Sequence, residues 1–379
     1  MSRAIFATLL VTALGLVAIG SLTSFKSPDW SAWKLALVAG EFGYFLATFT
    51  ALVGAGIWFS RGGMPSVLAF VGVGLSACAI VLFLMPLVQA REIARTLPND
   101  LTRAFGQVPL DRPAFSVGGL FAARPVAVAV ETREYAPGLS LDFYRVAIRP
   151  SGPCVLLVHG GGWDSGTRDE IAHFNHWLVS RGYAVAAVDY RLAPKFPWPA
   201  QREDLAAAIA FLKANAKSLG IDATRLVLLG RSAGGQLAEA AAYAKPDSSI
   251  RGVVALYAPA DVHFAWEFGR DDDVLNSPRL LKNFLGGTPA AARANYESAS
   301  PILYAGKSSP PTLLIHGRLD TLVWHRQSER LAQKLDEAGV KHAFVSLPWA
   351  THAFDYNLNG PGGQLSIYAI EWFLAAVTK

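Results

Sequence analysis

The first ninety residues contain three long apolar runs, at residues 4–22, 35–59 and 65–88. Glu41 is the one charged residue inside these runs. An α-helix rises about 1.5 Å per residue, so each run is long enough to cross a hydrocarbon layer roughly 30 Å thick. Amphipathic rings favoured at membrane surfaces lie at the ends of the second run: Trp30, Trp33 and Trp58. The pattern predicts a three-helix transmembrane region over residues 1–90.

A cleaved signal peptide stays an alternative for the first run, because Arg3 precedes it and small residues lie near its end. Three spans would divide the basic residues unequally between the two sides of a membrane. One side receives Lys26, Lys34, Arg91, Arg95 and Arg103, and the other receives Arg3 and Arg61. The positive-inside rule then predicts a multi-pass membrane protein with a cytoplasmic catalytic domain, whereas a cleaved signal peptide would place that domain outside.

Residues 91–125 have mixed charge and several prolines, and they predict a short juxtamembrane helix followed by a linker. From residue 126 to residue 379, short β-type runs alternate with helical patterns. The expected strands are 126–134, 139–148, 155–158, 183–188, 226–229, 253–256, 312–315 and 343–347. The expected helices are 170–180, 200–216, 236–243, 326–338 and 364–377. A hairpin followed by alternating elements predicts an α/β domain with a mostly parallel, doubly wound sheet.

Residues 226–237 combine a β run, a turn of small residues and the start of an alanine-rich helix. The turn reads Gly230-Arg231-Ser232-Ala233-Gly234. A serine on so tight a strand-to-helix turn exposes its hydroxyl at the positive end of the helix. The glycines two positions before and after it leave room for the sharp backbone. We therefore predict that Ser232 is a catalytic nucleophile.

A glycine-rich segment, residues 159–163, directly follows the buried run 155–158 and reads His-Gly-Gly-Gly-Trp. Consecutive glycines leave backbone N–H groups unobstructed, so Gly161 and Gly162 can donate to an oxyanion, as can Ala233 next to the nucleophile. A phosphate-binding loop would need a lysine and a hydroxyl, which this segment lacks.

An acid and a base for the serine follow two later strands. Asp320 comes after the run 312–315, and His352 comes after the run 343–347. The carboxyl ends of parallel strands meet at one edge of a sheet, so we expect these side chains to lie near Ser232. Asp261 and Asp355 remain alternatives for the acid, because the first follows a strand and the second lies near His352.

From about residue 130 to the end, the chain resembles the hormone-sensitive-lipase-like and BD-FAE-like esterases of the α/β-hydrolase superfamily. The matching segments are HGGGW at 159–163, DYRLAP at 189–194, GRSAGG at 230–235, SPI at 300–302, HGRLD at 316–320 and THAF at 351–354. The resemblance implies an α/β-hydrolase fold with an eight-stranded sheet. It implies the triad of Ser232, Asp320 and His352, with oxyanion donors at the three backbone positions named above. Arg231 departs from the acidic, His or Gln residue more usual before the nucleophile, which bears on substrate preference.

Composition changes this picture in three respects. The net charge of +5 comes from scattered basic residues, which argues against a nucleic-acid partner. Cys78 and Cys154 lie in apolar runs and predict no disulfide framework. Glycines recur in the apolar runs and allow close helix packing, in a compact bundle or a homo-oligomer.

The sequence thus predicts a membrane-anchored serine hydrolase that cleaves small-molecule or lipid carboxylic esters through an acyl-enzyme, without a metal or other cofactor. Two alternatives stay open: an amidase or formamidase using the same triad, and a lipid-binding membrane sensor with an inactive hydrolase domain. Aromatic residues that could line the substrate pocket are Trp163, Phe196 and Trp198. Residues 261–298 are longer than a usual connection between strands, and we expect them to form a partial lid.

Overall fold

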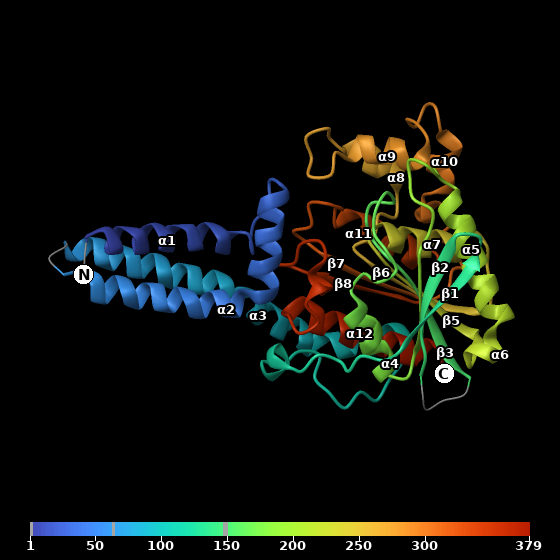
Figure 1. Ribbon diagram of the computed structural model, residues 1–379, viewed down its shortest axis with the longest axis horizontal. Coiled ribbons are helices and arrows are strands. Elements are labelled where there is room, and N and C mark those ends of the chain that lie inside the picture. Colours follow the sequence, from blue (N-terminus) through green and yellow to red (C-terminus); the bar gives the residue numbers. More distant parts are fainter. Residues whose placement is uncertain (1–2, 63–64, 147–150) are drawn as a thin grey trace.

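The computed structural model of the protein describes residues 3–62, 65–146 and 151–379. Three long helices form a bundle, and an α/β domain lies beside one end of it (Figure 1). The N-terminus is at the far end of the bundle, away from the α/β domain (Figure 1). The bundle corresponds to the apolar first ninety residues, and the α/β domain corresponds to the alternating strand and helix patterns from residue 126 onward.

The bundle consists of α1 (Arg3–Ser21), α2 (Trp30–Ser60) and α3 (Ser66–Phe105). Each of the three is long and apolar enough to cross a membrane, judged by length and composition. Helix α2 begins before the expected apolar run, because the Asp29 carboxylate accepts hydrogen bonds from the backbone N–H groups of Ser31 and Ala32, at 2.8 and 2.9 Å. Such an N-cap satisfies two of the free donors at the start of a helix.

Helix α3 is continuous to Phe105, so the juxtamembrane helix expected after residue 91 is the second half of the same helix. Pro86 and Pro98 lie inside it and do not end it. Leu97 and Leu101 are buried in the core of the α/β domain. That tertiary packing stabilises the helix through a stretch with mixed charge and a proline at position 98.

Glycine allows the helices of the bundle to touch along their backbones. A Cβ atom on Gly43 of α2 would lie 2.5 Å from the Phe83 carbonyl oxygen of α3. A Cβ on Gly20 of α1 would lie 3.0 Å from Leu82 Cβ. Close contact of this kind replaces the hydrophobic effect as the source of helix association in lipid.

The α/β domain contains one eight-stranded sheet in the order β1-β2-β4-β3-β5-β6-β7-β8. Its strands are β1 (Val130–Ala136), β2 (Leu139–Tyr144), β3 (Gly152–Val158), β4 (Ala184–Val188), β5 (Ile221–Arg231), β6 (Ile250–Leu256), β7 (Thr312–Gly317) and β8 (His342–Leu347). β1 pairs with β2 and β2 with β4 in antiparallel fashion, and all other pairs are parallel. This confirms the expected hairpin and mostly parallel sheet; residues 147–148 of the second expected run lie outside the described residues.

Helices cover both faces of the sheet: α4 (Ala172–Ser180), α5 (Ala200–Ala214), α6 (Ala216–Leu219), α7 (Ala233–Ala244), α11 (Arg326–Glu337) and α12 (Pro361–Val377). Strand β3 explains why both faces need covering, because its side chains alternate between two apolar clusters. Leu156 and Val158 belong to one cluster, and Val155 and Leu157 belong to the other. A strand covered on both faces therefore appears in the sequence as an unbroken apolar run.

The long connection between β6 and β7 folds into α8 (Val262–Phe268), α9 (Ser277–Leu285) and α10 (Arg293–Ser298). These helices gather at one end of the α/β domain (Figure 1). The segment expected to form a partial lid thus contains three short helices. Its position relative to the active site is described below.

Glu41 of α2 joins the bundle to the α/β domain. Its carboxylate accepts hydrogen bonds from the Gly362 N–H, at 2.9 Å, and from the Trp349 indole N–H, at 3.2 Å. Gly362 lies in the first turn of α12, where free N–H groups and the helix dipole favour an anion. The one charged residue in the apolar runs therefore contacts the α/β domain.

Candidate active site

Ser232 lies at the sharp turn between β5 and α7. Its backbone has φ of 52° and ψ of −123°, a conformation that non-glycine residues adopt rarely. A Cβ on Gly230 would lie 2.1 Å from the Gly234 carbonyl oxygen, and a Cβ on Gly234 would lie 2.3 Å from the His159 carbonyl oxygen. Both glycines of the motif are therefore required by close backbone contacts. The serine is lifted to the carboxyl end of the central strand.

His352 and Asp320 form a hydrogen-bonded pair beyond the carboxyl ends of β8 and β7. His352 Nδ1 donates to Asp320 Oδ2 at 2.6 Å. The other oxygen, Oδ1, accepts the backbone N–H groups of Leu322 and Val323 at 2.8 and 2.9 Å. Asp320 is completely buried. The carboxylate thus has a fixed orientation and holds the imidazole with Nδ1 protonated and Nε2 free to act as a base.

Two opposing influences act on the pKa of Asp320. Burial alone would raise it, but the facing imidazoles of His352 and His316 outweigh burial and hold the pKa well below its ordinary value. Asp320 therefore stays ionised at neutral pH, as a residue that orients and stabilises an imidazolium must.

His316, at the end of β7, is a second histidine beside Asp320, a contact not predicted from the sequence. Its Nε2 lies 3.2 Å from Asp320 Oδ2 and 3.0 Å from the Val323 carbonyl oxygen. Its Nδ1 lies 2.7 Å from the Ser328 hydroxyl. A proton on Nε2 satisfies both oxygens and leaves Nδ1 to accept from the serine. His316 therefore helps to fix the position of the Asp320 carboxylate, which in turn orients His352.

Ser232 and His352 line the same cavity. Within the described residues no hydrogen bond joins their side chains, and Asp320 lies buried behind the imidazole. Bonds between a nucleophile and its base are often long in unliganded enzymes and shorten when substrate binds. The geometry brings the three predicted residues to one edge of the sheet.

The glycine-rich segment borders the nucleophile. Gly160 is so near that a Cβ on it would lie 3.5 Å from Ser232 Cβ, and its N–H donates to Glu170 Oε2 at 2.8 Å. Gly161 and Gly162 have φ of 101° and 59°, and a Cβ on Gly161 would lie 2.2 Å from the Ser165 carbonyl oxygen. Gly161 and Gly162 line the cavity beside Ser232, and Ala233 begins α7, where N–H groups lack intrahelical acceptors.

Arg231, the unusual residue before the nucleophile, is buried. Its Nε donates to Asp355 Oδ2 at 2.5 Å, and the Tyr257 hydroxyl donates to Asp355 Oδ1 at 2.5 Å. The guanidinium lies over the Phe174 ring, 4.5 Å from its centroid. The Tyr257 ring lies 4.3 Å from that of His352. Asp355, an alternative for the acid in the sequence, thus pairs with Arg231, whereas Asp320 pairs with His352.

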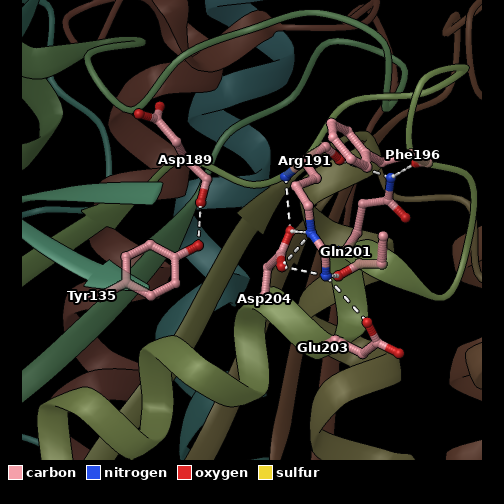
Figure 2. Close-up of polar contacts among 8 residues, drawn as sticks. Tyr135, Asp189, Arg191, Phe196, Gln201, Glu203 and Asp204 are labelled. Atoms are coloured by element: carbon pink, nitrogen blue, oxygen red, sulfur yellow. Dashed lines mark hydrogen bonds and ion pairs between the residues drawn. The ribbon is translucent and has the colours of Figure 1, made fainter. Parts of the chain in front are cut away.

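The turn after β4, residues 189–191, is held by contacts with neighbouring side chains. Figure 2 shows Arg191 held by two carboxylates: Asp204, with an Nε to Oδ1 distance of 2.7 Å, and Glu203, at 3.1 Å from the terminal nitrogen. The Tyr135 hydroxyl donates to the Asp189 carbonyl at 2.6 Å (Figure 2). Charge-assisted bonds of this kind fix the loop beside the site.

Two cavities meet at Ser232. The first, which we name the lid cavity, lies against α8 and α9 and is mainly apolar; its wall includes Trp163, Phe264, Phe268, Leu280, Leu322 and Trp324. The second, which we name the junction cavity, lies between the catalytic residues and the start of α2; its wall includes Gly161, Arg231, His352, Tyr257, Trp30 and Trp33. Helices α8 and α9 thus cover the nucleophile, as expected of a partial lid.

The three aromatic residues predicted to contact substrate are placed differently. Trp163 lines the lid cavity, stacks on Phe284 with ring centroids 4.2 Å apart and donates to Gln236 Oε1 at 2.8 Å. Trp198 is buried and donates to Ser298 Oγ at 2.8 Å, and Phe196 lies near Arg191. Phe196 and Trp198 belong to neither cavity wall as described.

Sequence reasoning missed Trp30 and Trp33 as wall residues, because they precede the α/β domain by a hundred residues and were assigned to the membrane surface alone. It also missed the contact of Glu170 with the glycine segment. The described residues contain no cluster of three or more His, Cys, Asp or Glu side chains arranged to hold a metal ion.

Comparison with known proteins finds a matching family model and several related esterases. A family model described as BD-FAE matches residues 141–335, just over half of the chain. Esterase LipC of Mycobacterium tuberculosis is 27% identical over 320 residues, which cover 77% of this chain and 78% of that protein. The "Probable carboxylic ester hydrolase LipM" of the same organism is 28% identical over 264 residues, which cover 64% of this chain and 59% of that protein.

Solved structures agree on the fold. A Pyrobaculum calidifontis esterase aligns with a TM-score of 0.57 at 23% identity, over 76% of this chain and 94% of that chain. At this identity the alignment supports the α/β-hydrolase fold and nothing finer. This chain spans 59% of the length of LipM and 56% of that of another relative, Esterase LipQ of Mycobacterium tuberculosis.

Proposed function

Because this chain belongs to the BD-FAE family of α/β-hydrolases, we propose that it hydrolyses carboxylic esters with Ser232 as nucleophile, His352 as general base and Asp320 as the orienting acid. The names of LipC and LipM, an esterase and a carboxylic ester hydrolase, support this reaction class. The single observation that carries the proposal is the 2.6 Å bond between His352 and a buried carboxylate, in an imidazole that shares a cavity wall with Ser232.

In the first half of the proposed reaction, His352 Nε2 takes the Ser232 proton as Oγ attacks the ester carbonyl carbon. The carbonyl oxygen becomes an oxyanion, which would accept hydrogen bonds from the N–H groups of Gly161, Gly162 and Ala233. The intermediate then collapses: the bond to the alcohol oxygen breaks, and the imidazolium gives that oxygen its proton. Asp320 stays ionised throughout and stabilises the imidazolium.

In the second half, water replaces the alcohol. His352 takes one proton from the water as its oxygen attacks the acyl carbon of the acyl-enzyme. Collapse of the second intermediate breaks the acyl–Oγ bond, and His352 returns the proton to Ser232. One ester and one water thus yield one carboxylic acid and one alcohol.

The proposal includes anchoring in a membrane by α1, α2 and α3, which have the length and composition for it. The excess of Lys and Arg near the α/β domain favours its location on the cytoplasmic side. Fusion of a reporter enzyme to the C-terminus, compared with one inserted after residue 61, tests this orientation.

Covalent labelling tests the mechanism. The full-length protein in detergent micelles should react with a fluorophosphonate probe and hydrolyse p-nitrophenyl esters. Ser232→Ala should lose both properties, whereas the matched control Ser248→Ala should keep them, because this exposed serine precedes β6 at the opposite end of the parallel strands. Equal labelling of both variants would rule out Ser232 as the nucleophile. Acyl anilides assayed in parallel separate ester from amide hydrolysis.

A further inference from the structure

We propose that this site takes its substrate from the membrane surface and that the substrate is an amphiphilic carboxylic ester. Its long apolar chain would enter the lid cavity, while its polar part would lie in the junction cavity against Trp30 and Trp33. This inference rests on the proposed ester hydrolysis and adds the source and class of the substrate. Four observations carry it.

The first observation is the level at which the membrane surface must lie. Gly20, Gly43 and Phe83 come together at the end of the bundle next to the α/β domain, because Cβ atoms on the two glycines would contact Leu82 and the Phe83 backbone. From that level to the far end, α1, α2 and α3 each contribute about 18 residues, or about 27 Å of helix. That length matches a hydrocarbon layer roughly 30 Å thick. The α/β domain therefore begins directly at the membrane surface.

The second observation is what lies just beyond this level. Glu41 and Gly40, two and three residues before Gly43, already contact the α/β domain: Glu41 bonds to Gly362, and a Cβ on Gly40 would lie 3.4 Å from Trp349 Cδ1. The start of α2 thus lies at the end of the bundle that faces the α/β domain (Figure 1). These contacts hold the α/β domain against the end of the bundle.

The third observation is the wall of the junction cavity. Trp30 and Trp33, in the first turn of α2, line the cavity that also contains Ser232 and His352. Their rings lie 4.7 Å apart, and Trp30 is 44% exposed. Indole rings prefer the membrane–water boundary, because one end is apolar and the other donates a hydrogen bond. The same two side chains thus border the cavity of the nucleophile at the end of the bundle that faces the α/β domain.

The fourth observation connects the lid cavity to the same surface. The Lys26 ammonium, in the loop between α1 and α2, lies over the Trp324 ring of the lid cavity, 5.7 Å from its centroid. Around this contact, large apolar side chains remain exposed: Phe25 by 69%, Phe268 by 42% and Trp324 by 38%. A rim of exposed aromatic residues beside an apolar cavity suits an alkyl chain that leaves a bilayer.

The experiment uses full-length protein reconstituted into phosphatidylcholine vesicles. The rate of hydrolysis of a long-chain p-nitrophenyl ester dissolved in those vesicles is divided by the rate for a short-chain, water-soluble one, both per fluorophosphonate-labelled enzyme. The double variant Trp30→Ala/Trp33→Ala should lower this ratio by about tenfold, which corresponds to ~1.4 kcal/mol of lost contact at the surface. The matched control Trp58→Ala removes an indole at the opposite end of α2 and should leave the ratio unchanged.

An unchanged ratio in the double variant would overturn the inference. This includes the case in which both rates fall by the same factor, because the substitutions would then only have disturbed the site. Failure of the proposed ester hydrolysis looks different. In that case the parent protein would not label with fluorophosphonate and would cleave neither ester, so no ratio could be formed. A second variant, Phe268→Ser in the lid cavity, should lower the long-chain rate more than the short-chain rate.

Discussion

The ion pair of Arg231 and Asp355 offers a test of how the site is held together. Both side chains are only 2% exposed, and they are joined at 2.5 Å. Burial alone would lower the pKa of Arg231, but the facing Asp355 carboxylate outweighs it and raises the pKa above its ordinary value, so the guanidinium is charged. Among the described residues, the two terminal nitrogens of Arg231 have no hydrogen-bond acceptor. Asp355 is therefore the one hydrogen-bond acceptor of the Arg231 side chain among the described residues, while Asp355 also accepts from the Tyr257 hydroxyl.

The expected loss in the free energy of unfolding depends on which buried charge each substitution leaves without its partner. Arg231→Met leaves a buried carboxylate with only the Tyr257 hydroxyl, and Asp355→Asn leaves a buried guanidinium without a counter-charge. Either change should lower the free energy of unfolding by about 3–5 kcal/mol. The double variant leaves no buried charge and should come within about 2 kcal/mol of the parent, which makes the coupling between the two sites at least ~4 kcal/mol.

Denaturant unfolding of the full-length protein in micelles of fixed composition, followed by tryptophan fluorescence, measures these energies. The matched control is Arg330→Met, which breaks a 2.7 Å pair with Asp261 that is partly exposed and should cost at most about 1 kcal/mol. If the two single variants add in the double variant, the buried pair does not stabilise the site in the way inferred. Since Asp355 lies three residues after His352, ester hydrolysis should fall in each single variant and recover in the double one.

Three further predictions concern single residues. Asp320→Asn should lower kcat by about a thousandfold or more, because the amide favours the wrong imidazole tautomer; steady-state kinetics measure this, and a loss under tenfold would contradict the assignment. Gly161→Ala should lower kcat and stability together, because its φ is 101° and the added Cβ would lie 2.2 Å from the Ser165 carbonyl oxygen; unchanged kinetics would contradict its role as an oxyanion donor. Burial raises the pKa of Glu239 to about 8, so the folded state favours the protonated acid and loses stability as pH rises from the ordinary value of 4.5 through 8. Between pH 6 and 9 the parent should lose about 3 kcal/mol that Glu239→Gln keeps, and parallel pH profiles in denaturant unfolding would refute this.

The order of elements followed from local patterns. Residues 155–158 and 226–229 are unbroken apolar runs because both faces of a central parallel strand are covered, and each proved to be part of such a strand. Gly230 and Gly234 identified the turn at Ser232 because no side chain fits at either position. The ends of the elements depended on tertiary contacts as well. Helix α3 continues to Phe105, because contacts of Leu97 and Leu101 with a domain far along the chain stabilise it.

By itself, the sequence determined which residues could do chemistry here: a serine on a glycine turn, and an aspartate and a histidine after two later strands. The type of a residue and its place after a strand are local properties, so they can be recognised from the sequence alone. Tertiary structure alone decided which of three aspartates faces the histidine, that His316 shares that carboxylate, and that two tryptophans from a preceding helix line the cavity. The contact of Asp320 with His352 and the place of the tryptophans beside Ser232 join positions tens to hundreds of residues apart. They depend on how the strands and the helix bundle pack together, which no local pattern encodes.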